Sequence, residues 1–291
     1  MRGLAEFIMR GRWQALAVAV LGAGSLFFSW ISAAAVALVT LRKGLSEGGW
    51  LVLWALLPSV IAAWMSGDSG SVLLLAGTFS LAALLRNTVS LALAVAASSA
   101  VGFVSGACLL LFSGEFLDQL VEVFGLVLEQ VADSLSAGGD ASIVLPAPTA
   151  LQVAGILAGG NAATAVLSLL LARYWQALLY NPGGFKREFY ALRLPKIWSL
   201  IFLGAGLALW LQPTGISSWA LMFVVPLSVC GFALAHAWVS RSGGGSGRLA
   251  MFYCLWLLFD PVKGVVLALV LVDAMIDFRS RWAANGPDSG A

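Results

Sequence analysis

Few polar side chains interrupt the apolar stretches of this 291-residue chain, so each one is a candidate for chemistry. Asn161 lies in the middle of such a stretch, within the segment Gly-Gly-Asn-Ala-Ala at 159–163. An amide in an apolar medium is costly unless it is hydrogen-bonded, and the neighbouring glycines allow close approach of another group. Asn161 therefore predicts either a contact to a bound small molecule or a hydrogen bond between two helices.

Arg86 and Asn87 join two apolar stretches with no spacer between them. One interpretation adds them to Asn161 as ligand contacts, with Arg86 binding an anion at the cytoplasmic mouth of a cavity. The alternative is a short turn at which the arginine stem lies along apolar surface and its head reaches water.

Two further patterns of charge have helical spacing. Asp260 and Lys263 are three residues apart, which predicts either a polar gate or an ion pair that stabilises a turn near the membrane interface. Asp273, Asp277 and Arg281 follow one another at intervals of four, so they share one helix face. That face predicts either a docking surface for a cytoplasmic partner or a ladder of salt bridges.

The residue types used by metal sites and nucleophilic enzymes are sparse. The three cysteines, Cys108, Cys230 and Cys254, lie in separate apolar stretches without a CxxC pattern, and His236 is the only histidine. A lone histidine lacks the companions that a metal site or a catalytic triad requires. No nucleophile elbow, phosphate loop or HExxH pattern is present. We therefore expect no metal, no cofactor and no enzymatic activity.

The composition identifies the medium in which these residues act. Hydrophobic residues make up 60% of the chain and charged residues only 10%, against about 25% charged in soluble domains. In lipid, long apolar runs must form helices because every backbone polar group has to be satisfied internally. The runs are continuous rather than alternating, which excludes the pattern of a membrane β-barrel. The net charge of +2 is too small to indicate a nucleic-acid partner.

The expected fold is an all-α, polytopic transmembrane bundle of about eight to ten membrane segments in one domain, residues 1–283, followed by a disordered tail at 284–291. A full membrane crossing needs about 20 residues, and several of the apolar stretches are shorter than that. We therefore expect half-length hairpins among them. The apolar stretches are 13–28, 30–41, 48–66, 71–85, 88–112, 149–179, 197–211, 216–239 and 249–276.

The positions of Lys and Arg predict the orientation, since basic loops stay in the cytoplasm. All basic clusters fall on one side if residues 13–41 form a hairpin of two short helices and if the last stretch breaks at Asp260-Pro261. A single helix over 13–41 would move some clusters outside, and no proline marks a turn there. Both termini and the basic loop 180–196 are then cytoplasmic. We expect the protein in the cytoplasmic (inner) membrane of a bacterium.

The segment 113–147 is acidic and has no Lys or Arg. Its acidic residues Glu115, Asp118, Glu122, Glu129 and Asp133 differ by three, four, seven and four positions, so they form one stripe of an amphipathic helix. We expect an external helix and loop, which serves as a lid on the bundle or as a solvated connector.

Two stretches, 172–195 and 271–281, resemble the YybS-like family of uncharacterised bacterial inner-membrane proteins. That family is distantly similar to the substrate-binding subunits of energy-coupling-factor transporters. The resemblance implies a compact helical fold and no particular ligand. In those subunits small-residue motifs on an early helix dock a coupling subunit, and Ser-Ala-Ala-Ala-Val-Ala at 32–37 is a stretch of that kind.

The leading functional hypothesis is a membrane-embedded protein that binds an apolar or amphipathic small molecule and is related to transport. The alternative is a non-transporting scaffold or accessory factor that binds a cytoplasmic protein partner. Its contact residues would be Lys186, Arg187 and Arg193 in the basic loop, together with the face of Asp273, Asp277 and Arg281.

Overall fold

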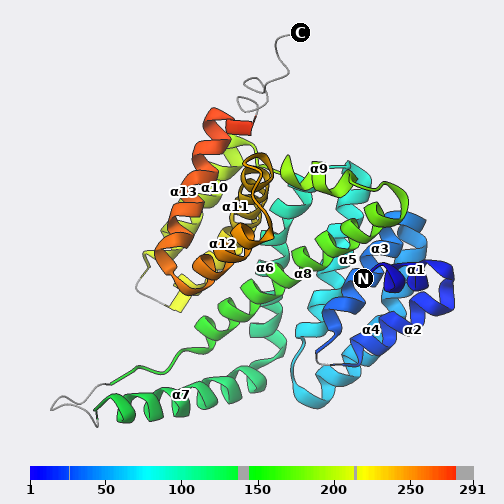
Figure 1. Ribbon diagram of the computed structural model, residues 1–291. Coiled ribbons are helices and arrows are strands. Elements are labelled where there is room, and N and C mark those ends of the chain that lie inside the picture. Colours follow the sequence, from blue (N-terminus) through cyan, green and yellow to red (C-terminus); the bar gives the residue numbers. More distant parts are fainter. Residues whose placement is uncertain (26, 137–143, 213–214, 280–291) are drawn as a thin grey trace.

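The computed structural model describes residues 1–25, 27–136, 144–212 and 215–279, and over these residues the chain consists of helices joined by turns (Figure 1). The all-α prediction is therefore confirmed. The helices are α1 (Arg2–Arg10), α2 (Arg12–Ala23), α3 (Ser29–Lys43), α4 (Leu45–Ser66), α5 (Gly70–Thr88), α6 (Leu91–Phe112), α7 (Gly114–Ser136), α8 (Ala150–Tyr180), α9 (Gly184–Tyr190), α10 (Lys196–Trp210), the 3₁₀ helix η1 (Gly215–Ala220), α11 (Leu221–Arg241), α12 (Ser246–Leu258) and α13 (Asp260–Ile276).

Every apolar stretch found in the sequence coincides with helical structure. Five helices are long and apolar enough to cross a membrane, namely α4, α5, α6, α8 and the continuous pair η1–α11. The pair α12–α13 passes the same test only as one unit, because each of the two helices is too short alone, and the pair bends by 114° at its break. The shorter α10 is also apolar. This arrangement is that of a multi-pass membrane protein.

Residues 13–41 form two helices, as the charge pattern favoured. α2 and α3 pack against each other, and the Ser32 hydroxyl donates a hydrogen bond to the Ala19 carbonyl oxygen at 2.6 Å. α2 ends at Ala23, earlier than the predicted end at residue 28, and α3 begins at Ser29, one residue before the predicted start. The short helix α1, which precedes the hairpin, was not predicted.

α3 is the centre of the larger half of the molecule, where α2, α4, α5 and α8 surround it (Figure 1). All residues from Ser32 to Leu41 are buried. The alanines at 33–35 let the neighbouring helices approach closely, as small residues do in membrane bundles. The small-residue stretch 32–37 therefore packs inside this chain and presents no surface to a coupling subunit.

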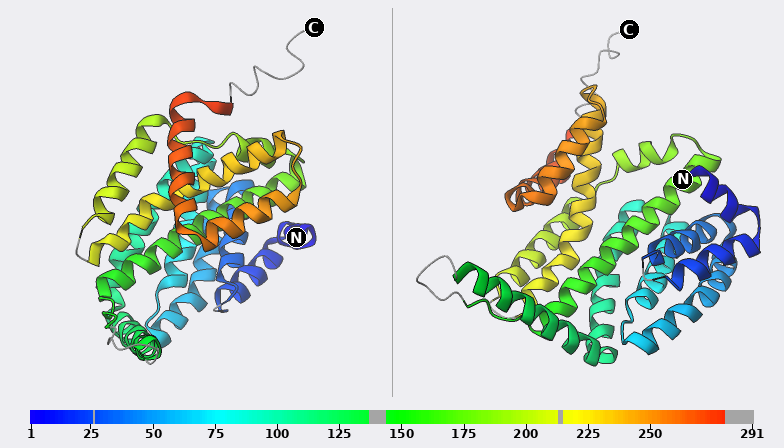
Figure 2. Two further views of the ribbon diagram at one scale, coloured as in Figure 1. Left: turned by 60° about the vertical axis from the view of Figure 1, so that its left-hand side comes forward. Right: turned by 60° about the horizontal axis from the view of Figure 1, so that its bottom comes forward.

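The other half of the molecule contains α10 to α13, and α6 and α8 lie between the halves (Figures 1 and 2). α11 packs against α6, α8, α10 and α13. The predicted break at Asp260-Pro261 is confirmed, because Phe259 adopts an extended conformation between α12 and α13. Proline is tolerated in the first turn of a helix, where its missing N–H costs nothing.

The two ends of the bundle differ in charge. At one end, which we call the basic end, Arg12 Nη2 lies 2.7 Å from Glu47 Oε1 and joins the starts of α2 and α4. At the opposite, acidic end, the turn between α4 and α5 meets the start of α7, where the Ser69 and Ser113 hydroxyls are 3.0 Å apart. α7 confirms the predicted helix within 113–147 and lies across the ends of α6 and α8 (Figure 1). Asp140 falls outside the described residues.

Candidate functional site: an apolar pocket between α11, α12 and α13

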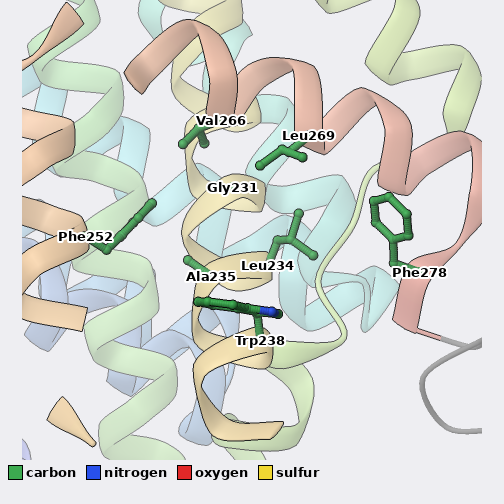
Figure 3. A pocket seen from close by; sticks show the side chains of 8 residues that line it. All are labelled: Gly231, Leu234, Ala235, Trp238, Phe252, Val266, Leu269 and Phe278. Atoms are coloured by element: carbon green, nitrogen blue, oxygen red, sulfur yellow. The ribbon is translucent and has the colours of Figure 1, made fainter. Parts of the chain in front are cut away.

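One apolar hollow lies where α12 and α13 diverge beside α11. Its volume is about 390 Å³, within the range of small-molecule sites. Figure 3 shows side chains from all three helices around this space. The lining residues are Gly231, Leu234, Ala235, Trp238, Phe252, Val266, Leu269 and Phe278. The lining is almost entirely apolar, so the pocket suits an apolar group.

The sequence produces this pocket through one break and one close contact. α12 and α13 meet at the 114° bend and diverge from it, so the two helices do not pack along their length. On the other side, α13 approaches α11 at Gly231, where a Cβ atom would collide with the Val266 side chain. The pocket is the space that remains between the bend and this contact.

Aromatic side chains attach α12 to α11, since α12 itself has no buried residue. The Phe232 ring makes edge contacts with Phe252, Tyr253 and Trp256, at centroid distances of 6.2, 5.3 and 4.9 Å. His236 Nε2 and the Tyr253 hydroxyl share a hydrogen bond of 2.9 Å. α12 is therefore held by one face of α11, and its other surfaces are open to the surroundings.

An ionic cluster closes the basic end of the pocket. The Arg279 guanidinium donates to the carbonyl oxygens of Tyr190 and Leu192, at 2.5 and 2.9 Å. It also lies 3.1 Å from the carboxylate of Asp273, whose side chain is 2% exposed. These bonds fasten the end of α13 to the loop between α9 and α10, next to the pocket residue Phe278.

Asp273 and Asp277 have described partners outside the spacing of four that the sequence suggested. Asp273 pairs with Arg279, and Asp277 Oδ2 lies 2.6 Å from Arg193 Nη1. Arg281 lies outside the described residues. Asp277 has a φ of 54° and ends α13, so the chain turns there and brings Arg279 back toward Asp273. Helical spacing could not reveal this pair, since the helix ends before Arg279.

Asp260 and Lys263 form the predicted ion pair, with Lys263 Nζ 2.6 Å from Asp260 Oδ1. They lie at the acidic end of α13, on the border of a second groove of about 410 Å³ between α10, α11 and α13. The Asp260 side chain is 90% exposed, so the pair is a surface feature at the mouth of that groove.

Asn161 lines neither the pocket between α11, α12 and α13 nor the second groove. Its side-chain amide donates to the Ser105 hydroxyl at 2.9 Å and joins α8 to α6. Of the two interpretations, this geometry favours the hydrogen bond between helices.

Arg86 and Asn87 also lie away from the pocket. Arg86 Nη1 donates to the carbonyl oxygens of Thr40 and Leu41, at 3.3 and 2.6 Å. These carbonyls belong to the last turn of α3, where a cation also interacts favourably with the helix dipole. Asn87 is exposed in the last turn of α5. Asn161 thus contacts α6 whereas Arg86 contacts α3, so the residues proposed as ligand contacts do not meet at one partner.

The basic loop contains both a paired cation and exposed cations. Arg193 pairs with Asp277, whereas Lys186 and Arg187 are exposed on α9. Lys186 Nζ lies 5.4 Å from the centroid of the Tyr190 ring. Within the described residues, no three His, Cys, Asp or Glu side chains come together in a way that could hold a metal ion.

These features define a helical, multi-pass membrane protein with an apolar pocket between its last three helices. In comparisons with known proteins, no family model, no curated protein and no solved structure matches the chain.

Proposed function

We propose that this protein binds an apolar or amphipathic small molecule in the pocket between α11, α12 and α13. The observation that carries the proposal is an apolar cavity of about 390 Å³ beside α12, a helix without buried residues. The pocket is half-open, and an apolar molecule can occupy a groove of this size between helices. Here the bend at Phe259 keeps the space open.

The pocket is a better candidate than the surroundings of Asn161. Its walls come from three helices and a turn, and its basic end is fastened by Arg279. The ligand would enter beside α12, which is attached mainly by aromatic contacts. We propose that the site has a transport-related role, in which this protein transfers the ligand to another component.

The test is native mass spectrometry of the protein extracted in a mild detergent, on wild type and two matched variants. Ala235→Trp fills the pocket from α11. Ala100→Trp, the control, adds the same side chain to a groove between α6 and α10. We expect a bound small molecule of discrete mass on wild type and Ala100→Trp and its loss from Ala235→Trp. A wild-type protein without any adduct, or an adduct that Ala235→Trp retains, would contradict the proposal.

A second function has one specific observation in its favour. Lys186 and Arg187 are exposed together on α9, a position suited to an acidic surface of a cytoplasmic protein. If the protein is a scaffold, the variant Lys186→Ala/Arg187→Ala should lose a co-purifying partner, and Ala235→Trp should keep it. If the pocket is the functional site, Ala235→Trp should lose the bound molecule and Lys186→Ala/Arg187→Ala should keep it.

A further inference from the structure

Helix α7 has a packed side, an apolar side and an acidic side, and the first two overlap in direction. The packed side includes Leu117, which is 1% exposed, and Ala132, which is 7% exposed. Leu117 belongs to a small core with Leu109 of α6 and Val153 of α8. The start of α7 is therefore anchored in the bundle.

A second side of α7 is apolar and exposed. Phe124, Val127, Val131 and Leu135 follow one another at intervals of three and four, so they form one stripe. Their exposed fractions lie between 43% and 56%. Among the described residues, neither the bundle nor the segment 144–149 buries this stripe.

The third side carries the acidic stripe. Glu122, Glu129 and Asp133 are exposed, and each lies two positions from a residue of the apolar stripe. Two positions correspond to a rotation of about 200° around an α-helix, so the two stripes point in nearly opposite directions. Leu117 is 18 positions from Leu135, which is about five full helical turns, so the apolar stripe continues the direction in which the start of α7 packs on the bundle.

The position of α7 in the molecule decides what the apolar stripe faces. The helix lies across the ends of α6 and α8 and beside the turn between α4 and α5, and it extends beyond them (Figures 1 and 2). The spans α4, α5, α6 and α8 place these ends at a membrane surface. A helix lying there, with one apolar and one charged side, matches the geometry of an interfacial helix.

We propose that α7 is a membrane-surface helix whose apolar stripe lies among the acyl chains of the leaflet at the acidic end, while its acidic stripe faces water. Interfacial helices are usually basic, because cations attract anionic lipids. α7 needs no such attraction. It is tethered to spanning helices at both of its ends, which gives it a high effective concentration at the surface. Its carboxylates point away from the headgroups.

The test uses nitroxide labels on single cysteines, in a protein whose Cys108, Cys230 and Cys254 are replaced by alanine and which is reconstituted in neutral phosphatidylcholine vesicles. Labels at Phe124, Val127 and Val131 are compared with labels at Glu122, Glu129 and Asp133. For each label we compare how often it collides with oxygen, which partitions into lipid, and how often it collides with a water-soluble nickel chelate. Leu57, an exposed apolar residue of α4, provides the lipid reference, and Lys186 provides the water reference.

We expect the three apolar sites to match Leu57 and the three acidic sites to match Lys186. High contact with the nickel chelate at both sets would show a solvated connector and overturn the proposal. Low contact with both reagents at the apolar sites would show that protein covers the stripe, either as a lid contact or as a second copy, and would also overturn it. Using three sites for each stripe keeps the result independent of one misfolded variant.

Discussion

At the scale of single residues, the polar groups that drew attention in the sequence are bound within the chain. Asn161 bonds to Ser105, Arg86 caps α3, and Asp273 pairs with Arg279. Sequence reasoning named the first two as either ligand contacts or structural groups. It missed Arg279, because the partner of Asp273 follows a chain reversal that no spacing rule describes.

The pair of Asp273 and Arg279 should dominate the stability of the pocket region. Arg279→Ala would leave a carboxylate that is 2% exposed without its cation, which costs about 3–5 kcal/mol. We expect a clear drop in the thermal unfolding midpoint in detergent. Arg2→Ala, which removes an ion pair with exposed side chains, should cost at most about 1 kcal/mol. Equal midpoints for the two variants would refute this assignment.

Asn161 allows a direct choice between its two interpretations. Asn161→Ala should cost about 0.6 kcal/mol, the average for hydrogen bonds between membrane helices, and should leave the bound molecule of the pocket unchanged. Thr164→Ala is the control, since its hydroxyl bonds only to Gly160 of its own helix. Loss of the adduct in native mass spectrometry of Asn161→Ala would instead assign this amide to a ligand.

At the scale of elements, continuous apolar stretches were sufficient to predict the helices, and the charge rule was sufficient to predict both hairpins. The short helix α1 was not predictable from apolar runs, because it is amphipathic and lies beside the bundle. The chain reversal that follows α13 was not predictable from them either. The role of the alanines in α3 also depends on its neighbours, since a stretch of small residues fits a contact within the chain or between chains.

Two adjacent glycines in α4 provide a test of how closely the elements pack. A Cβ atom at Gly48 would collide with the Thr40 side chain and lie 2.9 Å from the Thr40 Cα atom, whereas one at Gly49 would lie 3.9 Å from Phe79. Gly48→Ala should therefore push α3 and α4 apart and cost about 1–3 kcal/mol. Gly49→Ala should be neutral or slightly stabilising, because alanine favours helix. Thermal unfolding in detergent measures both, and a neutral Gly48→Ala would disprove the close contact.

At the scale of the whole molecule, composition predicted the membrane medium, and the positions of Lys and Arg predicted the one-sided distribution of charge. It could not predict the pocket. That space depends on the 114° bend and on the approach of Val266 to Gly231, residues 35 positions apart, and hydropathy contains no information about either angle or distance. The apolar stripe of α7 can likewise be found in the sequence, but the sequence does not show whether another element covers it.

The central claim is that lipid surrounds these helices, with the basic end in the cytoplasm and the acidic end outside. Single cysteines at Lys186 and Glu129, in the protein without its three native cysteines, test it directly with a thiol reagent that cannot cross membranes. The account predicts labelling of the Glu129 site in intact cells and labelling of the Lys186 site only after the cells are permeabilised. Labelling at Lys186 in intact cells would contradict it.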